Sequence, residues 1–336
     1  MIRLAILSRL LHGLDSANRF MIEPLLRLEP ALRDRGVCFD AEHPAGVLVD
    51  VDPPPGFTSS QPVVLLDRTD GATLWWYGTS QVHLARNWLK LPQVRGVIKV
   101  SRYTNTRLYN LPWAGAALHL HKIYETSPAA FPDILPTSVP EVTEGDLQKI
   151  VLGYGYWAFA ECDRLAEAKI DVDAPRALDV FCAACVDYES PMLARHRQLA
   201  MEAIQQLRHC RTITGWGRHL AHATYCDLMR QARICVSPWG WGETCIRDYE
   251  AMLAGCVLVK PRTDFIEAEP CMDERHYVPC AVDFSDLREK VDHILLHWYE
   301  YRPMRIENRR RLLALRKPEA LADRLAALLK QMFERE

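Results

Sequence analysis

The chain of 336 residues exceeds the usual size of one compact core, which favours two domains. Hydrophobic residues make up 49% of the chain and charged residues 25%, a balance that excludes disorder as its main state. The formal net charge of −2 lacks the basic excess that is typical of nucleic-acid-binding domains. The sequence therefore predicts no nucleic-acid partner.

The N-terminal apolar run, residues 1–8, is too short for the core of a signal peptide. No stretch of the sequence approaches the ~20 apolar residues that a membrane span needs. The eleven cysteines are scattered, and Cys182 and Cys185 form a CxxC pair with no second such pair elsewhere. We interpret these cysteines as reduced core residues. Together these features predict a cytoplasmic protein without a transmembrane segment.

The first half of the sequence alternates short β-branched runs with helical segments. We expect strands at 3–8, 47–51, 63–67 and 97–101, and helices at 16–35, 81–90 and 144–169. Strands that alternate with helices form right-handed crossovers, so this order predicts a parallel sheet.

A second alternating series follows. We expect strands at 178–183, 212–215, 234–237 and 256–260, helices at 191–207, 224–231 and 243–254, and almost continuous helix beyond residue 286. The predicted fold class is α/β, with two Rossmann-like domains that face a cleft. We place the first domain at 1–165 and the second at 166–310. The C-terminal helix, 311–336, is expected to cross back to the first domain.

The most informative segment is 234–260, where a strand, a glycine-containing loop and a helix follow one another. The strand ends at Ser237, and Gly240 and Gly242 lack a Cβ that would keep a ligand away from the backbone. We expect a helix to begin at Glu243, so that its free N–H groups face a bound phosphate. This order predicts an anion-binding turn at the carboxyl end of the sheet.

Three charged residues of this predicted helix, Glu243, Arg247 and Glu250, are spaced i, i+4, i+7 and would share one face. A carboxylate there can accept hydrogen bonds from ribose or sugar hydroxyls, and a guanidinium can hold a diphosphate with two bonds. The alternative is a surface helix with an ordinary ion pair worth only ~0.3–0.5 kcal/mol. The glycine loop directly before the helix favours the binding function.

The pattern Ser-Pro-x-Gly-x-Gly-Glu…Arg-Asp-x-Glu-Ala-x-x-Ala-Gly-x-Val-Leu-Val-Lys-Pro, at 237–261, resembles the donor-binding segment of GT-B glycosyltransferases. The group 1 and exostosin-like branches are the most similar, and the resemblance covers 212–261. It implies that this segment binds a nucleotide sugar and that Glu250 bonds the ribose. Many retaining members have a Glu-x7-Glu spacing, whose first carboxylate would fall at Gly242. The role of Glu243 and the stereochemical outcome therefore stay open.

Other donor-binding candidates occupy the loops that follow strands. Arg195, Arg197 and Lys260 could neutralise the diphosphate, with solvated or structural cations as the alternative. Arg218 lies in a loop that contacts the base and phosphates in the families that this chain resembles. Glu267 follows the next strand and is expected to face the donor sugar.

Three residues of the first domain, Asp67, Asp70 and His12, are candidates for the catalytic base of an inverting enzyme. The alternative for each is a capping or surface role. Two Asp-Val-Asp sequences, at 50–52 and 171–173, match a short metal-binding pattern that is common by chance, and we interpret both as structural. The sequence thus predicts no catalytic metal, and no cofactor besides the nucleotide-sugar substrate.

These observations predict a metal-independent glycosyltransferase that moves a sugar from a nucleotide-sugar donor to a glycan or other small acceptor, as in polysaccharide biosynthesis. The alternatives are a nucleotide-sugar epimerase of the same fold and a non-catalytic GT-B-like binding subunit. The basic stretch 305–316 leaves peripheral contact with an anionic membrane open, with a solvated helix face as its alternative.

Overall fold

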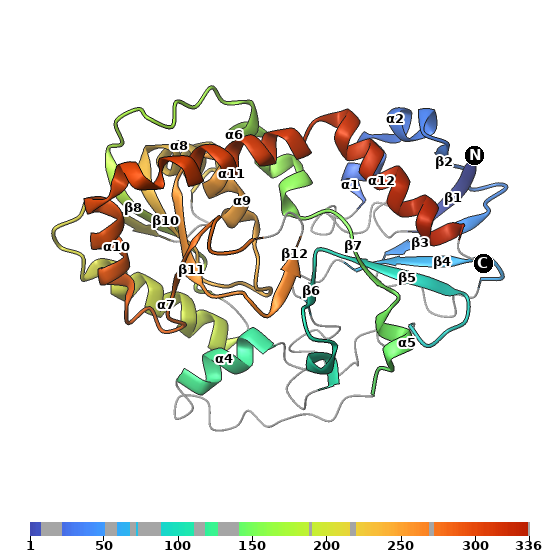
Figure 1. Cartoon of the computed structure of the whole chain (residues 1–336), viewed down its shortest axis with the longest axis horizontal. Helices are drawn as coiled ribbons and strands as arrows, with labels where there is room; N and C mark the ends of the chain where they lie inside the picture. Colours follow the sequence, from blue (N-terminus) through green and yellow to red (C-terminus); the bar gives the residue numbers. More distant parts are fainter. Residues whose placement is uncertain are drawn as a thin grey trace.

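The chain folds into two α/β halves, each built on its own parallel sheet (Figure 1). The computed structural model describes residues 1–7, 22–50, 59–67, 72, 89–110, 118–126, 141–187, 190–215, 220–268 and 272–334. We call the part around the first sheet the first half, and the part around the second sheet the second half.

Six parallel strands form the sheet of the first half: β1 (Ile2–Leu7), β2 (Val37–Phe39), β3 (Gly46–Asp50), β4 (Val63–Leu66), β5 (Val94–Lys99) and β7 (Ile150–Leu152). Their order is β2-β1-β3-β4-β5-β7. Helices α1 (Glu23–Arg27), α2 (Glu29–Asp34) and α12 (Pro318–Phe333) cover one face, and α5 (Glu144–Leu147) joins the apolar cluster of the other. Helix α4 (Leu118–Thr126) adds Leu120 and Ile123 to that second cluster and packs against the helix Pro191–Gln205 of the second half.

The central strands of this sheet are buried on both faces. Leu48 and Val64 belong to the apolar cluster that includes α2 and α12, whereas Val47 and Val63 belong to the cluster that includes α4. Successive side chains of a strand point to opposite faces, so a continuous apolar run supplies both clusters. This explains why the β-branched runs in the sequence predict these strands well.

Five parallel strands form the sheet of the second half: β8 (Leu178–Ala183), β9 (Thr212–Gly215), β10 (Ala232–Val236), β11 (Val257–Pro261) and β13 (Val278–Cys280). Their order is β13-β11-β10-β8-β9. One face packs against α7 (Pro191–Gln205) and α10 (Leu287–Leu296), and the other against α8 (His222–Gln231) and α9 (Ile246–Leu253). Short helical turns also occur among the described residues: η3 (Thr106–Asn110), η6 (Tyr156–Ala158), η7 (Ala160–Cys162), α6 (Asp163–Glu167) and η9 (Trp298–Tyr301).

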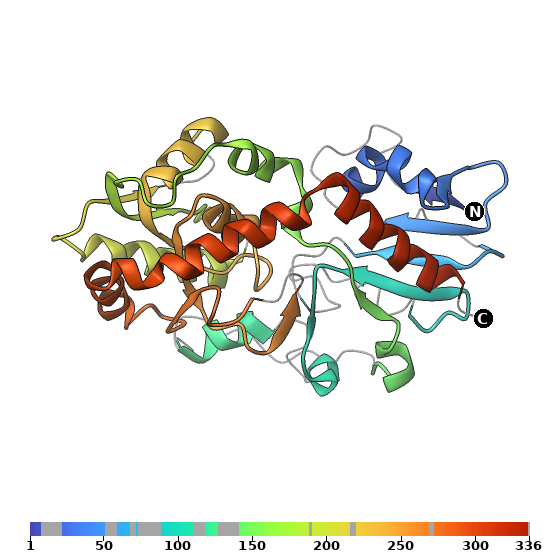
Figure 2. The same cartoon turned by 45° about the horizontal axis from the view of Figure 1, so that its top comes forward.

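Besides the chain between β7 and β8, a paired ribbon and a long helix connect the two halves. A two-stranded antiparallel ribbon pairs β6 (Ser101–Tyr103) of the first half with β12 (Ile266–Ala268) of the second. In addition, α11 (Arg302–Leu315) runs along the second half and leads into α12 on the first (Figures 1 and 2). Arg324 of α12 donates to the carbonyl oxygen of Gly153 at 3.0 Å.

The arginines of α11 fasten the crossover. Arg305 donates to the carbonyl of Val172 at 2.5 Å, and Arg309 to that of Ala168 at 2.6 Å. Arg316, directly after the helix, donates to the carbonyl of Phe159 at 3.2 Å and pairs with Asp163. These three cations of the stretch 305–316 bind the segment between the halves, rather than forming the solvated or membrane-facing surface that the sequence left open.

The predicted fold class is confirmed, and the expected strands from β1 to β11 match the structure closely. The predicted helix at 144–169 is wrong. Strand β7 interrupts it, because Ile150 and Val151 pair beside β5, and Gly153 and Gly155 follow without helical structure. The predicted helix at 81–90 lies almost entirely outside the described residues.

The predicted helix at 16–35 is described only from residue 22, where it forms two short helices separated by Leu28. Pro30 lies in the first turn of α2, where a missing N–H is tolerated, whereas inside a single helix it would break the ladder of hydrogen bonds. The proline therefore accounts for the break.

Candidate functional site

The turn between β10 and α9 contains four of the eleven predicted donor-binding residues, Ser237, Gly240, Gly242 and Glu243. The helix begins at Ile246, three residues later than expected, with Cys245 as its N-cap. The backbone N–H of Cys245 donates to Asp248 Oδ2 at 3.2 Å, and the Ser237 hydroxyl donates to Asp248 Oδ1 at 2.6 Å. Glu243 thus lies before the helix, and the predicted shared face of Glu243, Arg247 and Glu250 is wrong.

A buried ion pair anchors this helix to the sheet. Lys260 Nζ on β11 lies 2.5 Å from Asp248 Oδ2, and both side chains are 1% exposed. The same ammonium donates to the carbonyl oxygen of Glu243 at 2.8 Å. Lys260, predicted to face a diphosphate, is therefore used to hold the turn in place.

Two predicted arginines also bond the protein's own carbonyls. Arg247 donates to Ala183 O at 2.6 Å and to the hydroxyl of Ser237 at 3.1 Å. Arg197 donates to Trp239 O at 3.0 Å and to Cys185 O at 2.9 Å. Both guanidiniums are buried. This arrangement favours a structural role over direct contact with a ligand.

The close approach of Arg197 also explains why residue 240 is a glycine. A Cβ at Gly240 would lie 3.0 Å from Arg197 Nη2. The glycine thus makes room for a guanidinium of the protein. Arg195, in contrast, lies on the surface and pairs with Glu202 at 2.8 Å.

The turn packs against the first half. Glu243 Oε2 accepts from the backbone N–H of Ala72 at 3.0 Å, and its Oε1 lies 3.3 Å from His119 Nδ1, with both side chains fully buried. The other ring nitrogen of His119, Nε2, donates to Gly240 O at 3.1 Å. Burial alone would raise the pKa of Glu243, but His119 and the Ala72 amide outweigh it and lower that pKa. The predicted open, anion-binding turn is closed in this structure.

His196 supports the same turn from within the second half. Its Nε2 accepts from the backbone N–H of Trp239 at 3.1 Å, and its ring stacks on the Trp239 indole at 5.4 Å between centroids. Burial, His119 and Arg197 lower the pKa of His196 to about 3. A neutral imidazole is the form that can accept this hydrogen bond.

Glu250, on α9, lies beside His222 and Tyr225 of α8, and it is buried whereas His222 is exposed. Its Oε2 accepts from the Tyr225 hydroxyl at 2.9 Å, and its Oε1 lies 3.1 Å from His222 Nε2. Cys226 Sγ lies 3.5 Å from the same His222 nitrogen. The His222 side chain is 47% exposed, whereas that of Glu250 is 3% exposed. We call these four residues the Glu250 cluster.

The Glu250 cluster is also distinct electrostatically. The hydrogen bond to Glu250 raises the pKa of His222 despite partial burial. Burial and the carboxylate of Glu250 raise the pKa of Cys226 to about 12. Sequence reasoning missed His222, Tyr225 and Cys226. Their i, i+3, i+4 spacing places them along one side of α8, which begins at His222, two residues before the predicted start of this helix at 224. Only the fold brings that side opposite Glu250.

The candidates for the catalytic base do not form a site among the described residues. Asp67 Oδ2 lies 2.6 Å from Lys99 Nζ, and both side chains are fully buried between β4 and β5. This pairing favours a structural role for Asp67. Asp70 and His12 lie outside the described residues, as does the donor-binding candidate Arg218.

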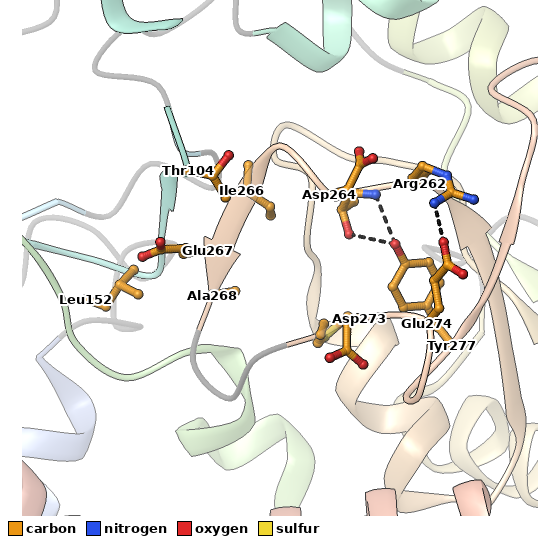
Figure 3. Close-up of a pocket in the computed structure, with 12 residues that line it drawn as sticks. Thr104, Leu152, Arg262, Asp264, Ile266, Glu267, Ala268, Asp273, Glu274 and Tyr277 are labelled. Atoms are coloured by element: carbon orange, nitrogen blue, oxygen red, sulfur yellow. Dashed lines mark hydrogen bonds and ion pairs between the residues drawn. The ribbon is translucent and has the colours of Figure 1, made fainter. Parts of the chain in front are cut away.

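A cavity of about 580 Å³ lies where the two halves meet, beside the β6–β12 ribbon (Figure 3). Thr104 and Leu152 line it from the first half, and the segments around β12 and Tyr277 line it from the second. Glu267, a predicted donor-sugar contact, lines this cavity and pairs with Arg102 of β6 at 2.7 Å. The ring of Tyr277 lies 5.9 Å from Lys260 Nζ, and this ring borders both the cavity and the buried turn.

Solved structures with a similar fold are glycosyltransferases. A glycosyltransferase from Rickettsia africae ESF-5 has a TM-score of 0.51 at 10% identity, covering 100% of this chain and 99% of that chain. An α-glucosyltransferase in complex with UDP and DNA has a TM-score of 0.50 at 8% identity, covering 99% and 100%. The chain has a GT-B fold. A structure of trehalose-6-phosphate synthase has a TM-score of 0.51 at 10% identity, covering 87% and 74%.

Other matches of this GT-B chain are to longer proteins. It covers 58% of a chain in the GtfA/B complex, at a TM-score of 0.46 and 10% identity. The sequence matches no protein-family model and no curated protein sequence. Among the described residues, no helix is both long and apolar enough to span a membrane.

Proposed function

We propose that this GT-B chain is a glycosyltransferase that binds a nucleotide sugar in its second half and transfers the sugar to a glycan or other small acceptor. The observation that carries the proposal is the position of Glu250. Helices α8 and α9 both begin at the carboxyl end of the second sheet, the edge at which open α/β sheets bind ligands. Glu250 lies between them, beside a histidine that is half exposed.

The chemistry of Glu250 suits a ribose. A carboxylate has about four acceptor positions, of which Tyr225 and His222 use two. The remaining positions can accept from the two vicinal hydroxyls of a ribose. Tyr225 fixes the orientation of the carboxylate, while the exposed His222 can turn aside to admit the ligand.

In this proposal the buried cations around the turn have a structural role and do not bind the ligand. Arg197, Arg247 and Lys260 keep the turn and α9 in place through bonds to carbonyls and to Asp248. The transfer is proposed to need no catalytic metal, so a chelator should not lower its rate. A cytoplasmic setting is part of the proposal, which the scattered and mostly buried cysteines favour.

The acceptor is assigned to the cavity that both halves line. Its volume of about 580 Å³ suits a small molecule, and Glu267 offers a carboxylate for sugar hydroxyls. Glu267→Gln should raise the KM for the acceptor and leave the Kd of the nucleotide unchanged. An unchanged acceptor KM would exclude this assignment.

The central test is nucleotide binding by calorimetry, with UDP as the first probe, since UDP is bound in the α-glucosyltransferase of the same fold. Glu250→Gln should weaken binding about 10- to 150-fold, because hydrogen bonds to a charged group contribute about 1.5–3 kcal/mol. Glu289→Gln, at a glutamate that is 80% exposed on α10, is the matched control.

The reaction itself is tested with a panel of nucleotide sugars. Nucleotide release that requires an acceptor supports transfer. Interconversion of the sugar without an acceptor would indicate an epimerase, and binding without turnover would indicate a non-catalytic subunit. No binding of any nucleotide, or equal binding by Glu250→Gln, would refute the proposed donor site.

A further inference from the structure

Three side chains of the Glu250 cluster converge as metal ligands do. The nearest ligand atoms of His222, Cys226 and Glu250 all lie within 4.8 Å of one another. His222 Nε2 is the central atom, 3.1 Å from Glu250 Oε1 and 3.5 Å from Cys226 Sγ. Two of the ligands come from α8 at i, i+4 spacing, and the third comes from α9.

The distances fit one small divalent ion. With zinc–sulfur bonds of about 2.3 Å and zinc–nitrogen or zinc–oxygen bonds of about 2.0–2.1 Å, tetrahedral geometry separates neighbouring ligand atoms by roughly 3.3–3.6 Å. The separations of 3.1 and 3.5 Å around His222 Nε2 are close to these values. The third pair, Cys226 and Glu250, lies within 4.8 Å, so these two side chains must move toward each other to hold the ion.

The surroundings also resemble those of a metal site. Tyr225 holds the second oxygen of Glu250 at 2.9 Å, the kind of outer hydrogen bond that fixes a ligating carboxylate. Cys226 is buried, whereas the His222 side chain is 47% exposed. An ion could therefore enter from the His222 side and keep one position open to solvent.

We propose that His222, Cys226 and Glu250 form a zinc-binding site whose occupation blocks nucleotide binding. A thiolate together with an imidazole selects zinc over magnesium, since magnesium prefers oxygen ligands. On coordination, the Cys226 thiol gives its proton to solvent and the sulfur binds the metal. The blocking step rests on the proposed function, because the metal occupies the Glu250 oxygens that would hold the ribose. The site is inhibitory and separate from catalysis, so it agrees with a metal-independent transfer.

The site itself is tested with Co²⁺, which reports thiolate coordination by a charge-transfer absorption band. The full-length, reduced protein should bind one Co²⁺ with this band, and Zn²⁺ should displace it. Cys226→Ser should abolish the band. Cys210→Ser, at a partly exposed cysteine outside the cluster, should retain it. His222→Gln changes a half-exposed side chain, so it tests the site without disturbing the core, and it should weaken Co²⁺ binding. A band that survives both cluster variants, or no band in the wild type, would overturn the site.

Competition is tested separately, by titrating UDP at fixed free Zn²⁺ in a metal buffer, because diphosphates chelate zinc. At a zinc concentration about tenfold above its own Kd, simple competition raises the apparent Kd for UDP about elevenfold. Cys226→Ser should lose this effect of zinc. An unchanged Kd would overturn the competition.

The cobalt result does not depend on nucleotide binding. If no nucleotide binds and the cobalt band is present, the proposed function and the blocking step are refuted while the metal site stands. If a nucleotide binds and the band is absent, the metal site and the blocking step are refuted while the proposed donor site stands.

Discussion

The two glutamates of the donor segment, Glu243 and Glu250, have opposite surroundings. Glu243 is sealed between the halves by Ala72 and His119. Among the described residues, Glu250 bonds His222 and Tyr225 of the second half, and the His222 side chain is half exposed. The same motif therefore supplies one carboxylate that joins the halves and one whose partners belong to the second half. The two glutamates are seven positions apart in the sequence. Because α9 begins only at Ile246, Glu243 lies before the helix and Glu250 lies on it.

The largest expected effect is on stability, and it tests the buried ion pair of Lys260 and Asp248 that holds the turn before α9. Lys260→Met would leave Asp248 charged and unpaired in the core. Because a buried pair that loses one partner costs about 3–5 kcal/mol, the free energy of unfolding should fall by about that amount in urea titrations. Adding Asp248→Asn should recover part of the loss, since no uncompensated charge remains. A loss below about 1 kcal/mol, typical of exposed pairs, would show that this ion pair is not buried.

Glu243→Gln should lower the free energy of unfolding by about 1–3 kcal/mol at neutral pH, since a buried charged hydrogen bond is lost. The pKa of Glu243 is lowered in the folded state, so its contribution exists above the ordinary value of 4.5 and is lost as pH falls through the folded pKa. The difference between wild type and variant should therefore shrink in acid. A difference that grows below pH 4.5 would contradict the ionised, His119-paired carboxylate.

Glu250→Gln should destabilise the protein less, by under about 1 kcal/mol, because Tyr225 can still donate to the amide oxygen and His222 is half exposed. Its pH dependence has the opposite sign. The pKa of His222 is raised, so its contribution is complete below the ordinary value of 6.5 and is lost as pH rises through the folded pKa. Unfolding experiments from pH 5 to 9 check this. If the stability losses of Glu243→Gln and Glu250→Gln had the same pH dependence, the predicted electrostatic difference between the two carboxylates would be wrong.

The smallest expected effect on stability comes from the exposed ion pair between β6 and β12. Arg102 and Glu267 are 42% and 44% exposed, so Arg102→Ala should cost only about 0.2–1 kcal/mol, and less at high salt. Thermal unfolding at two salt concentrations measures this. A larger loss would indicate that this ion pair, rather than the backbone pairing, holds the halves together.

The sequence predicted the strands well because buried parallel strands are continuous apolar runs, as in β4 and β8. Its assignment of Glu250 to a donor-binding segment stays a prediction. The sequence did not predict the roles of Arg247 and Lys260, because a cation that bonds carbonyls and one that bonds a phosphate have the same sequence pattern.

Residues that meet only through the fold were missed as well. His119 and Glu243 are separated by 124 positions in the chain, and no local pattern pairs them. His222 and Cys226 become relevant only because α8 lies beside α9. The start of α9 was misplaced because Glu243 is a common first-turn residue, whereas Cys245 is an unusual N-cap.

The ribbon of β6 and β12 restricts how the molecule could open. Its backbone pairing, from Ser101–Ala268 to Tyr103–Ile266, crosses the boundary between the halves at one edge of the cavity. Sliding the halves apart would break these bonds, whereas a rotation about the ribbon would keep them. A rotation that keeps the ribbon must also bend the connection between α11 and α12, which joins the same two halves. A swing about the ribbon that separates His119 from Gly240 and Glu243 would uncover the turn before α9 while the cavity edge stays in place.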